Sequence, residues 1–317
     1  MTDMKRRPVL IGIVFLLAIG VGCAAHLRLA RADFQSAVEA FERRDYVSAI
    51  DDLERILRQR PDSARVRILL GWSLYKKGDT ARAKREFEKA LIMNPNEPNA
   101  FYAYEGLGWI FYKAGNYDGA LAAFADSLRL NPAYHSPHNG LGWSYLAKGN
   151  LIRAAANFHA ALGLLPDDLE ARRGLAFVAY HHRDWTQAIL RFREVLRRDD
   201  GDTRSLSALG WAFYYKESYP RARKIFADLA RREPTWADPL LGLARVAERE
   251  GRHKEAKANF RAAIRKSAPY VATAESRRLL SEHPEWIDLW RELGWGLYHQ
   301  RAFAQAEAEF RALVAYH

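Results

Sequence analysis

The feature of this sequence that most constrains its fold is a segment that recurs along most of the chain. Five copies end in Leu-Gly-Trp, and an alanine and a phenylalanine follow each of them at fixed distances. Three weaker copies fill the gaps, and the period is 34 residues except at two joints. Such a period predicts a stack of similar supersecondary units rather than one closed core. The eight units begin near residues 30, 64, 101, 135, 169, 203, 237 and 287.

The spacing within one unit indicates a pair of helices, which we call helix A and helix B. In the second unit, Gly71 at the eighth position and Ala83 at the twentieth remove side-chain bulk where the two helices cross. Phe87 at the twenty-fourth position fills the space beside that crossing. The pair Gly78-Asp79 supplies the tight turn and the start of helix B, and Pro95 ends helix B. These patterns predict an all-α fold.

The repeated positions resemble those of the tetratricopeptide repeat family, and the resemblance covers nearly everything after residue 30. It implies a right-handed α-solenoid in which partners bind along the concave side. We expect seven repeats over 30–266, an extra unpaired helix within 267–286, read as Tyr270–Ser281, and an eighth repeat over 287–317. That last repeat has no polar capping helix, so we expect a partner or a second copy of the chain to cover its apolar face.

The amino end carries an apolar run, Val9–Ala25, which follows the basic residues Lys5, Arg6 and Arg7. Its length is marginal for a membrane span, and it also fits a signal peptide. Residues 1–29 therefore have three interpretations: an uncleaved signal anchor, a lipoprotein signal with Cys23 as the lipidated residue, or a signal cleaved near Ala24-Ala25. We predict a body tethered outside the cytoplasm, on the periplasmic side of the inner membrane, with an outer-membrane lipoprotein as the alternative.

Aromatic side chains concentrate on one side of the predicted helices A. The ninth position lies about 100° from the glycine of the crossing, on the side that the family uses as its concave groove. Aromatic rings along a groove are typical of binding hot spots, while the alternative is that they pack between neighbouring helices A. The candidate groove residues are Trp72, Trp109, Trp143, Phe177, Trp211 and Trp295 at the ninth position, with Tyr75, Tyr112, Tyr214 and Tyr298 at the twelfth.

Composition narrows the functional classes. Lys and Arg number 49 against 38 Asp and Glu, a formal charge of +11, but the arginine-rich stretches 191–198 and 221–232 fall on the exposed side of helices B. A solvated convex surface explains them better than a nucleic-acid site, and such a surface also suits anionic lipid head groups. The single cysteine excludes internal disulfides and CxxC sites, and there is no nucleophile elbow or phosphate-binding loop. We therefore expect no catalysis, no cofactor and no metal.

These observations favour a non-enzymatic scaffold that is tethered to a membrane and binds an extended segment of a protein partner in the aromatic groove. The alternative is a repeat protein of the cell envelope that binds a polysaccharide or assists its export, because Trp and Tyr faces stack well on sugar rings. Nucleic-acid binding is the least favoured class. It would require a cytoplasmic body and an affinity that falls steeply with salt.

Overall fold

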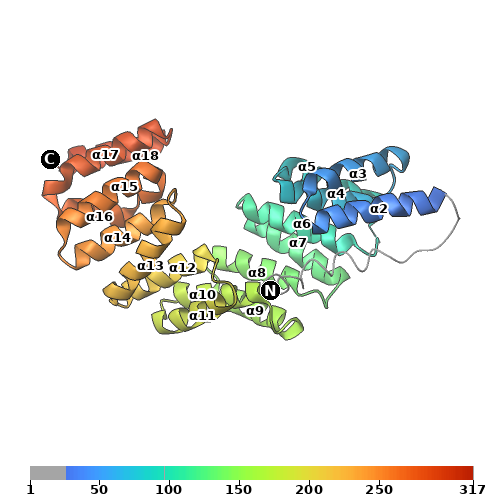
Figure 1. Ribbon diagram of the computed structural model, residues 1–317, viewed down its shortest axis with the longest axis horizontal. Coiled ribbons are helices and arrows are strands. Elements are labelled where there is room, and N and C mark those ends of the chain that lie inside the picture. Colours follow the sequence, from blue (N-terminus) through green and yellow to red (C-terminus); the bar gives the residue numbers. More distant parts are fainter. Residues whose placement is uncertain (1–25, 96, 317) are drawn as a thin grey trace. The chain divides into compact units, whose positions relative to one another are not determined.

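The computed structural model describes residues 26–95 and 97–316, and within these ranges every regular element is helical (Figure 1). The prediction of an all-α fold is thus confirmed. The apolar run 9–25 and Cys23 lie outside the described residues.

The helices follow one another in antiparallel pairs. The helix pairs are α2 (His26–Glu42) with α3 (Tyr46–Gln59), α4 (Ala64–Lys77) with α5 (Thr80–Met93), α6 (Ala100–Lys113) with α7 (Tyr117–Leu130), α8 (Ser136–Ala147) with α9 (Leu151–Leu164), α10 (Leu169–His181) with α11 (Trp185–Arg198), α12 (Thr203–Tyr215) with α13 (Tyr219–Arg232), α14 (Ala237–Arg249) with α15 (His253–Val271), and α17 (Ile287–His299) with α18 (Phe303–Tyr316).

The turn inside each pair follows a common design. Helix α4 ends at Gly78, whose φ of 100° lies in the left-handed region, and the Asp79 side chain then accepts a hydrogen bond from the Arg82 amide to start α5. Gly115 and Gly149 adopt the same conformation in the next two repeats, as the sequence predicts. Four other turns place a residue other than glycine there, at φ values between 59° and 63°: Arg44, Arg183, Glu217 and Arg301.

The crossing of the helices is built around the phenylalanine at the twenty-fourth position. Phe124 of α7 is fully buried between Gly108 of its own helix A and Gly140 of the following one. A Cβ atom added to either glycine would lie 2.6 Å or 2.3 Å from the Phe124 ring, so only glycine lets the helices approach this closely. The same arrangement holds for Phe87 between Gly71 and Gly106, Phe158 between Gly142 and Gly174, and Phe226 between Gly210 and Gly242.

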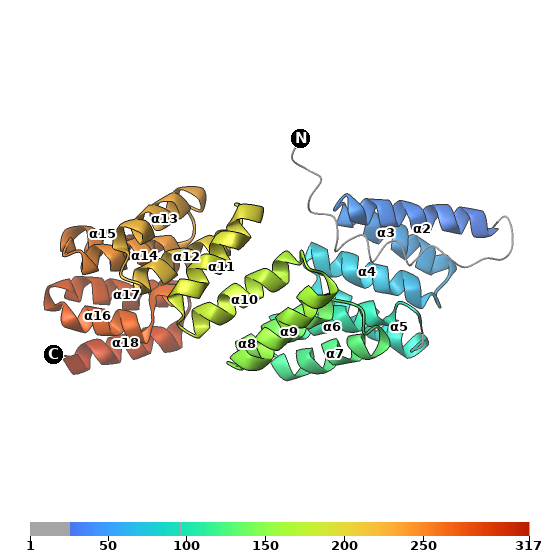
Figure 2. The ribbon, with the colours of Figure 1, turned by 90° about the horizontal axis from the view of Figure 1, so that it is seen from below.

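The chain divides into two compact units within α10, between Gly174 and Leu175. In the first unit, helix B of each repeat packs on helix A of the next, as α3 does on α4, α5 on α6 and α7 on α8. The second unit repeats this order, with α11 on α12 and α13 on α14 (Figure 2). Each unit is therefore a stack of helix pairs, as expected for an α-solenoid of this kind.

The second unit contains one departure from the regular pairing. Helix α15 continues to Val271 through a non-helical residue, Ser267, with φ −158° and ψ 95°. In the segment where the sequence predicts an extra helix over 270–281, the structure has α16 (Ala274–Glu282), followed by the short helix η2 (Pro284–Trp286). The Arg277 guanidinium lies 2.6 Å from the buried carboxylate of Glu309 in α18, so α16 is fixed to the last repeat.

Within the described residues, no helix combines the length and the apolar character needed to cross a bilayer. The predicted tether falls on residues 1–29, most of which the structure does not describe. It therefore stays a prediction.

Candidate binding groove

Each ring at the ninth position packs edge-on against the phenylalanine of its own repeat. Trp109 and Phe124 are typical, with centroids 5.1 Å apart and an angle of 75° between the ring planes. This contact gives every candidate ring a packing role, whatever else it does. The other pairs have centroids between 5.1 and 5.7 Å apart: Trp72–Phe87, Trp143–Phe158, Phe177–Phe192, Trp211–Phe226 and Trp295–Phe310.

The candidate rings differ in how much surface they offer to a ligand. Trp72 is only 4% exposed, and its indole N–H donates to the carbonyl oxygen of Tyr102 at 3.1 Å. Trp295, at 53%, is largely exposed. The rings between these extremes are half-buried, namely Trp109, Trp143, Phe177 and Trp211; of the tyrosines, Tyr75 and Tyr214 are buried, Tyr112 is half-buried and Tyr298 is exposed.

In the first unit, the groove positions of two repeats meet at a buried carboxylate. Glu105 of α6, only 3% exposed, accepts hydrogen bonds from the Trp109 indole N–H at 3.4 Å and from the Tyr134 hydroxyl at 2.7 Å. The Ser136 hydroxyl of α8 donates to it as well. Burial raises the pKa of Glu105 above its usual range, and the hydrogen bonds and the charge of Lys76 oppose this only in part. We call Glu105, Trp109, Tyr134 and Ser136 the Glu105 site.

Two lysines of the thirteenth position lie over aromatic rings near this site. The Lys113 Nζ is 4.2 Å from the centroid of the Tyr75 ring, and the Lys76 Nζ is 5.8 Å from that of Trp72. Burial lowers the pKa of Lys76, and so does the charge of Lys113, while Glu105 acts in the opposite direction. Burial and the charge of Glu105 raise the pKa of Tyr75 to about 12. The first unit thus joins aromatic rings, a buried acid and two cations.

The second unit contains a matching arrangement in which the acid and the serine have exchanged places. Asp238 of α14, only 1% exposed, accepts a hydrogen bond from the Trp211 indole N–H at 2.8 Å. The hydroxyls of Ser207 in α12 and of Tyr270 in α15 donate to the same carboxylate. Burial, followed by the charge of Asp238, raises the pKa of Tyr270 well above its usual range. We call Ser207, Trp211, Asp238 and Tyr270 the Asp238 site.

An aromatic surface surrounds the Asp238 site. The Tyr215 ring stacks on Trp185, with centroids 4.8 Å apart and ring planes 20° apart. The centroid of the Tyr215 ring also lies 6.2 Å from that of Trp211. Tyr215 and Tyr270 are 39% and 44% exposed, so their rings are accessible to a ligand although the carboxylate beneath is not.

The tryptophans are predictable from the repeat pattern, but the polar groups they contact are not. The fifth position of one repeat and the second of the next approach the ninth, as helical spacing predicts. The residues at those positions in this chain are Glu105 with Ser136 and Ser207 with Asp238. Their polar character inside an aromatic stripe was the available signal. Tyr270 comes from the irregular segment after Ser267, for which the repeat offers no register.

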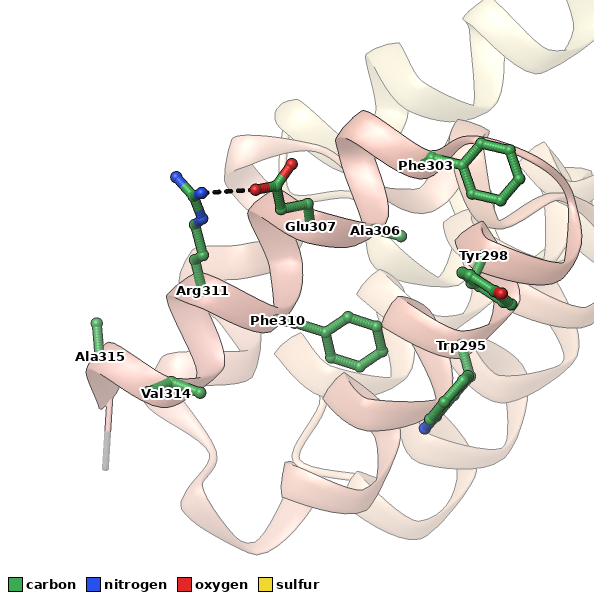
Figure 3. A pocket seen from close by; sticks show the side chains of 9 residues that line it. All are labelled: Trp295, Tyr298, Phe303, Ala306, Glu307, Phe310, Arg311, Val314 and Ala315. Atoms are coloured by element: carbon green, nitrogen blue, oxygen red, sulfur yellow. Dashed lines mark ion pairs between the residues drawn. The ribbon is translucent and has the colours of Figure 1, made fainter.

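The last helix pair carries a separate apolar cleft of about 790 Å³ between α17 and α18 (Figure 3). Gly294 approaches one side of the Phe310 ring, where an added Cβ would lie 2.6 Å away. The ion pair between Glu307 and Arg311 borders the cleft. The apolar side chains that line it include Trp295, Tyr298, Phe303, Phe310 and Val314.

The described residues contain no group of three or more His, Cys, Asp or Glu side chains placed to hold a metal ion. The acids of the two sites accept hydrogen bonds from hydroxyl and indole donors. The arrangement is suited to recognition of a bound segment through aromatic and polar contacts.

Comparison with known proteins agrees with this description. The family model described as "Tetratricopeptide repeat" matches residues 34–83, 68–135, 139–203 and 207–272. No protein among those with a curated description matches the chain in sequence.

Solved structures share the fold at low sequence identity. A tetratricopeptide repeat protein from Parabacteroides merdae aligns with a TM-score of 0.57 and 16% identity, over 75% of this chain and 93% of that one. The protein PilF of Pseudomonas aeruginosa aligns with a TM-score of 0.57 and 19% identity, over 71% and 99%. A chain of the Cut9–Hcn1 hetero-tetramer of the APC/C aligns with a TM-score of 0.65 and 19% identity, over 75% of this chain and 48% of that one.

Proposed function

The chain belongs to the tetratricopeptide repeat family, and from this premise we propose that it is a non-enzymatic scaffold that binds an extended segment of a partner protein along its helices A. Proteins of this family generally serve as interaction scaffolds. The observation that carries the proposal is the repeated site geometry. In both units a ninth-position tryptophan donates to a buried carboxylate shared between neighbouring repeats.

The geometry explains how such a groove would recognise a peptide. The hydrogen bonds from Ser136 and Tyr134 to Glu105 fix the rings and the carboxylate before any partner arrives. A preorganised surface loses less side-chain freedom on binding. Half-buried Trp109 offers rigid contact area, while Lys76 and Lys113 favour an acidic group in the segment.

We also propose that residues 1–29 tether this scaffold to a membrane, with the body on the periplasmic side of the inner membrane. The support is the uncharged run Val9–Ala25 behind three basic residues. A topology reporter fused after His317 tests the location of the body. Mass measurement of the mature amino terminus separates a signal anchor from a lipoprotein modified at Cys23 and from cleavage near Ala24-Ala25.

The proposed groove is tested with the full chain as bait for partners from solubilised membranes. The partner segment is then titrated against the Trp109→Ala/Trp143→Ala variant. We expect its affinity to fall at least about tenfold, which corresponds to about 1.4 kcal/mol. The matched control is Ile92→Ala/Leu164→Ala, two exposed residues on helices B of the same unit. Equal affinity for the two variants, both shown folded by circular dichroism, would overturn the groove proposal.

A polysaccharide is the second candidate ligand, and the Asp238 site is the observation that favours it. Accessible faces of Tyr215 and Tyr270 beside a carboxylate are typical of sugar-binding surfaces. Binding to a glycan array that disappears in Tyr215→Ala but persists in Trp109→Ala would support this candidate over a peptide in the first unit.

Self-association remains a prediction for the cleft between α17 and α18. In four other repeats a glycine of the following helix covers the phenylalanine that corresponds to Phe310. A second copy that supplies a small residue there would bury Phe303 and Val314, which are exposed in the single chain. Light scattering on the full chain and on Val314→Asp tests this prediction, since the variant should lose any dimer that the cleft forms.

A further inference from the structure

Helices B of the second unit carry a ladder of dibasic pairs. The pairs occupy the twenty-ninth and thirtieth positions of three successive repeats, in the last regular turn of α11, α13 and α15. Because successive repeats stack in the same orientation, these ends lie along one edge of the unit. We call the six residues the dibasic edge: Arg197 and Arg198, Arg231 and Arg232, and Arg265 and Lys266.

The first unit shows that the repeat itself does not require these pairs. Its residues at the same two positions are Arg58-Gln59, Ile92-Met93, Arg129-Leu130 and Gly163-Leu164. The helices differ in overall charge as well. Helix α13 has five basic residues against one acidic, whereas α3 has two against three. Helices B of the second unit, such as α11 and α13, thus carry more basic charge than α3 of the first unit does.

Half of the dibasic edge has no counter-charge within the described residues. Arg197, Arg265 and Lys266 are exposed and form no ion pair there. Arg198 pairs with Glu194, while Arg231 and Arg232 share Asp228. One cation in a last turn suffices to complement the helix dipole, as Arg58 does in α3. The helix dipole therefore does not explain why the last turns of α11, α13 and α15 each carry a second basic residue.

A shallow recess on α15 provides a second, independent observation. Its lining combines two alanines, Ala258 and Ala262, with Arg261, Arg265 and Lys266. Arg261 is held by Asp288 and Glu292 of α17, so its charge is already compensated. Arg265 and Lys266 border this recess and form no ion pair within the described residues, so they are available to bind an anionic group.

We propose that the dibasic edge binds the anionic head groups of a phospholipid bilayer and docks the second unit on the membrane surface. Clusters of four to eight Lys and Arg residues are typical of such contacts. Single-stranded nucleic acid is a poorer fit, because its binding sites alternate cations with rings on which bases stack. The six positions of the edge carry no ring, and Phe213, over which Arg193 and Arg221 lie, is buried. This contact is independent of the groove and of the amino-terminal tether.

The test uses the full chain reconstituted with vesicles of phosphatidylcholine alone or mixed with phosphatidylglycerol in equal parts. Hydrogen exchange is followed at the last turns of α11, α13 and α15. Head groups bound there hold these turns closed, so we expect exchange about threefold slower or more on the anionic vesicles, with the effect lost at high salt. Reconstitution makes the comparison independent of how strongly residues 1–29 hold the chain.

The decisive variant is Arg197→Glu/Arg231→Glu/Arg265→Glu, which should lose the protection. The control, Arg58→Glu/Lys77→Glu/Arg85→Glu, makes the same change in net charge at exposed residues of the first unit and should keep it. Equal exchange on the two kinds of vesicle, or equal loss in both variants, would overturn the proposal. So would protection of the same turns by a single-stranded oligonucleotide in detergent without protection by anionic vesicles. None of these outcomes bears on peptide binding in the groove.

Discussion

At the scale of single residues, the two buried carboxylates hold the side chains of the proposed groove in place. Glu105 and Asp238 are held by neutral donors, and each ties a tryptophan of one repeat to a residue of another. A buried carboxylate needs hydrogen bonds to offset its desolvation, and the bonds that do so here also fix the tryptophan and hydroxyl side chains around each acid. The tryptophans themselves were predictable from the repeat. The acids were not, because a repeat pattern highlights shared residues and these positions differ between repeats.

The raised pKa of Glu105 predicts a pH-dependent stability. As pH rises above the ordinary glutamate range, the unfolded chain releases this proton while the folded chain keeps it, so Glu105 lowers stability progressively up to its folded pKa. Glu105→Gln removes this loss. We expect the variant to gain stability relative to the parent as the pH rises from 4.5 to 7, because it has no proton to keep. Urea unfolding across this range measures it, with Glu42→Gln at an exposed position as the control. A difference that does not vary with pH would contradict the assignment.

At the scale of the element, the helix pair is defined by a phenylalanine held between two glycines. The glycine of the same repeat was predictable, because it precedes each tryptophan. The second glycine, such as Gly106 or Gly140, belongs to the following repeat, and only the packing of neighbouring units shows its purpose. Similarly, the glycine turn was predictable for Gly78, whereas Glu217 adopts the same backbone without a glycine to mark it.

Packing at this scale predicts opposite effects for two changes of glycine to alanine in the first unit. In Gly106→Ala the new Cβ would lie 2.4 Å from the Phe87 ring, which Gly71 confines on its other side. We expect a loss of about 1–3 kcal/mol from overpacking. Gly163 in α9 has no neighbour within 4 Å of an added Cβ, so Gly163→Ala should stabilise by up to about 1 kcal/mol. Chemical denaturation of both variants measures the free energy of unfolding. Similar changes in the two variants would contradict tight packing of the Phe87 ring between the two glycines.

The backbone conformation of the turns predicts opposite effects on stability for two further substitutions. Glu217 has a φ of 59°, which is unfavourable for a residue with a Cβ, so Glu217→Gly should stabilise the second unit by about 0.5–1 kcal/mol. Gly149 has a φ of 77° and open space around it, and Gly149→Ala should destabilise the first unit by about 1 kcal/mol through strain alone. Thermal unfolding of the two variants checks the signs. Destabilisation by Glu217→Gly would show that the glutamate side chain matters more than the backbone.

At the scale of the whole molecule, the chain assigns different chemistry to its two units. The first unit combines aromatic rings with Lys76 and Lys113 on helices A and has nearly balanced charge on α3. The second has the aromatic surface around Asp238 together with the dibasic edge. The number of repeats could be predicted from the periodicity, and the fold class from the resemblance of the repeated positions to a known family. The division of charge could not, because net charge is a sum over the chain and shows no surface until the repeats are placed in register.

The most direct measurement for the central claim is photo-crosslinking of the full chain to its partner. A photoreactive phenylalanine analogue replaces either Tyr112, a half-buried residue of the proposed groove in α6, or Leu164, exposed at the end of α9 in the same unit. If an extended segment binds along helices A, Tyr112 should give an adduct with one defined stretch of the partner, and Leu164 should give none. Adducts from Leu164 without any from Tyr112 would place the partner on helices B and contradict the account.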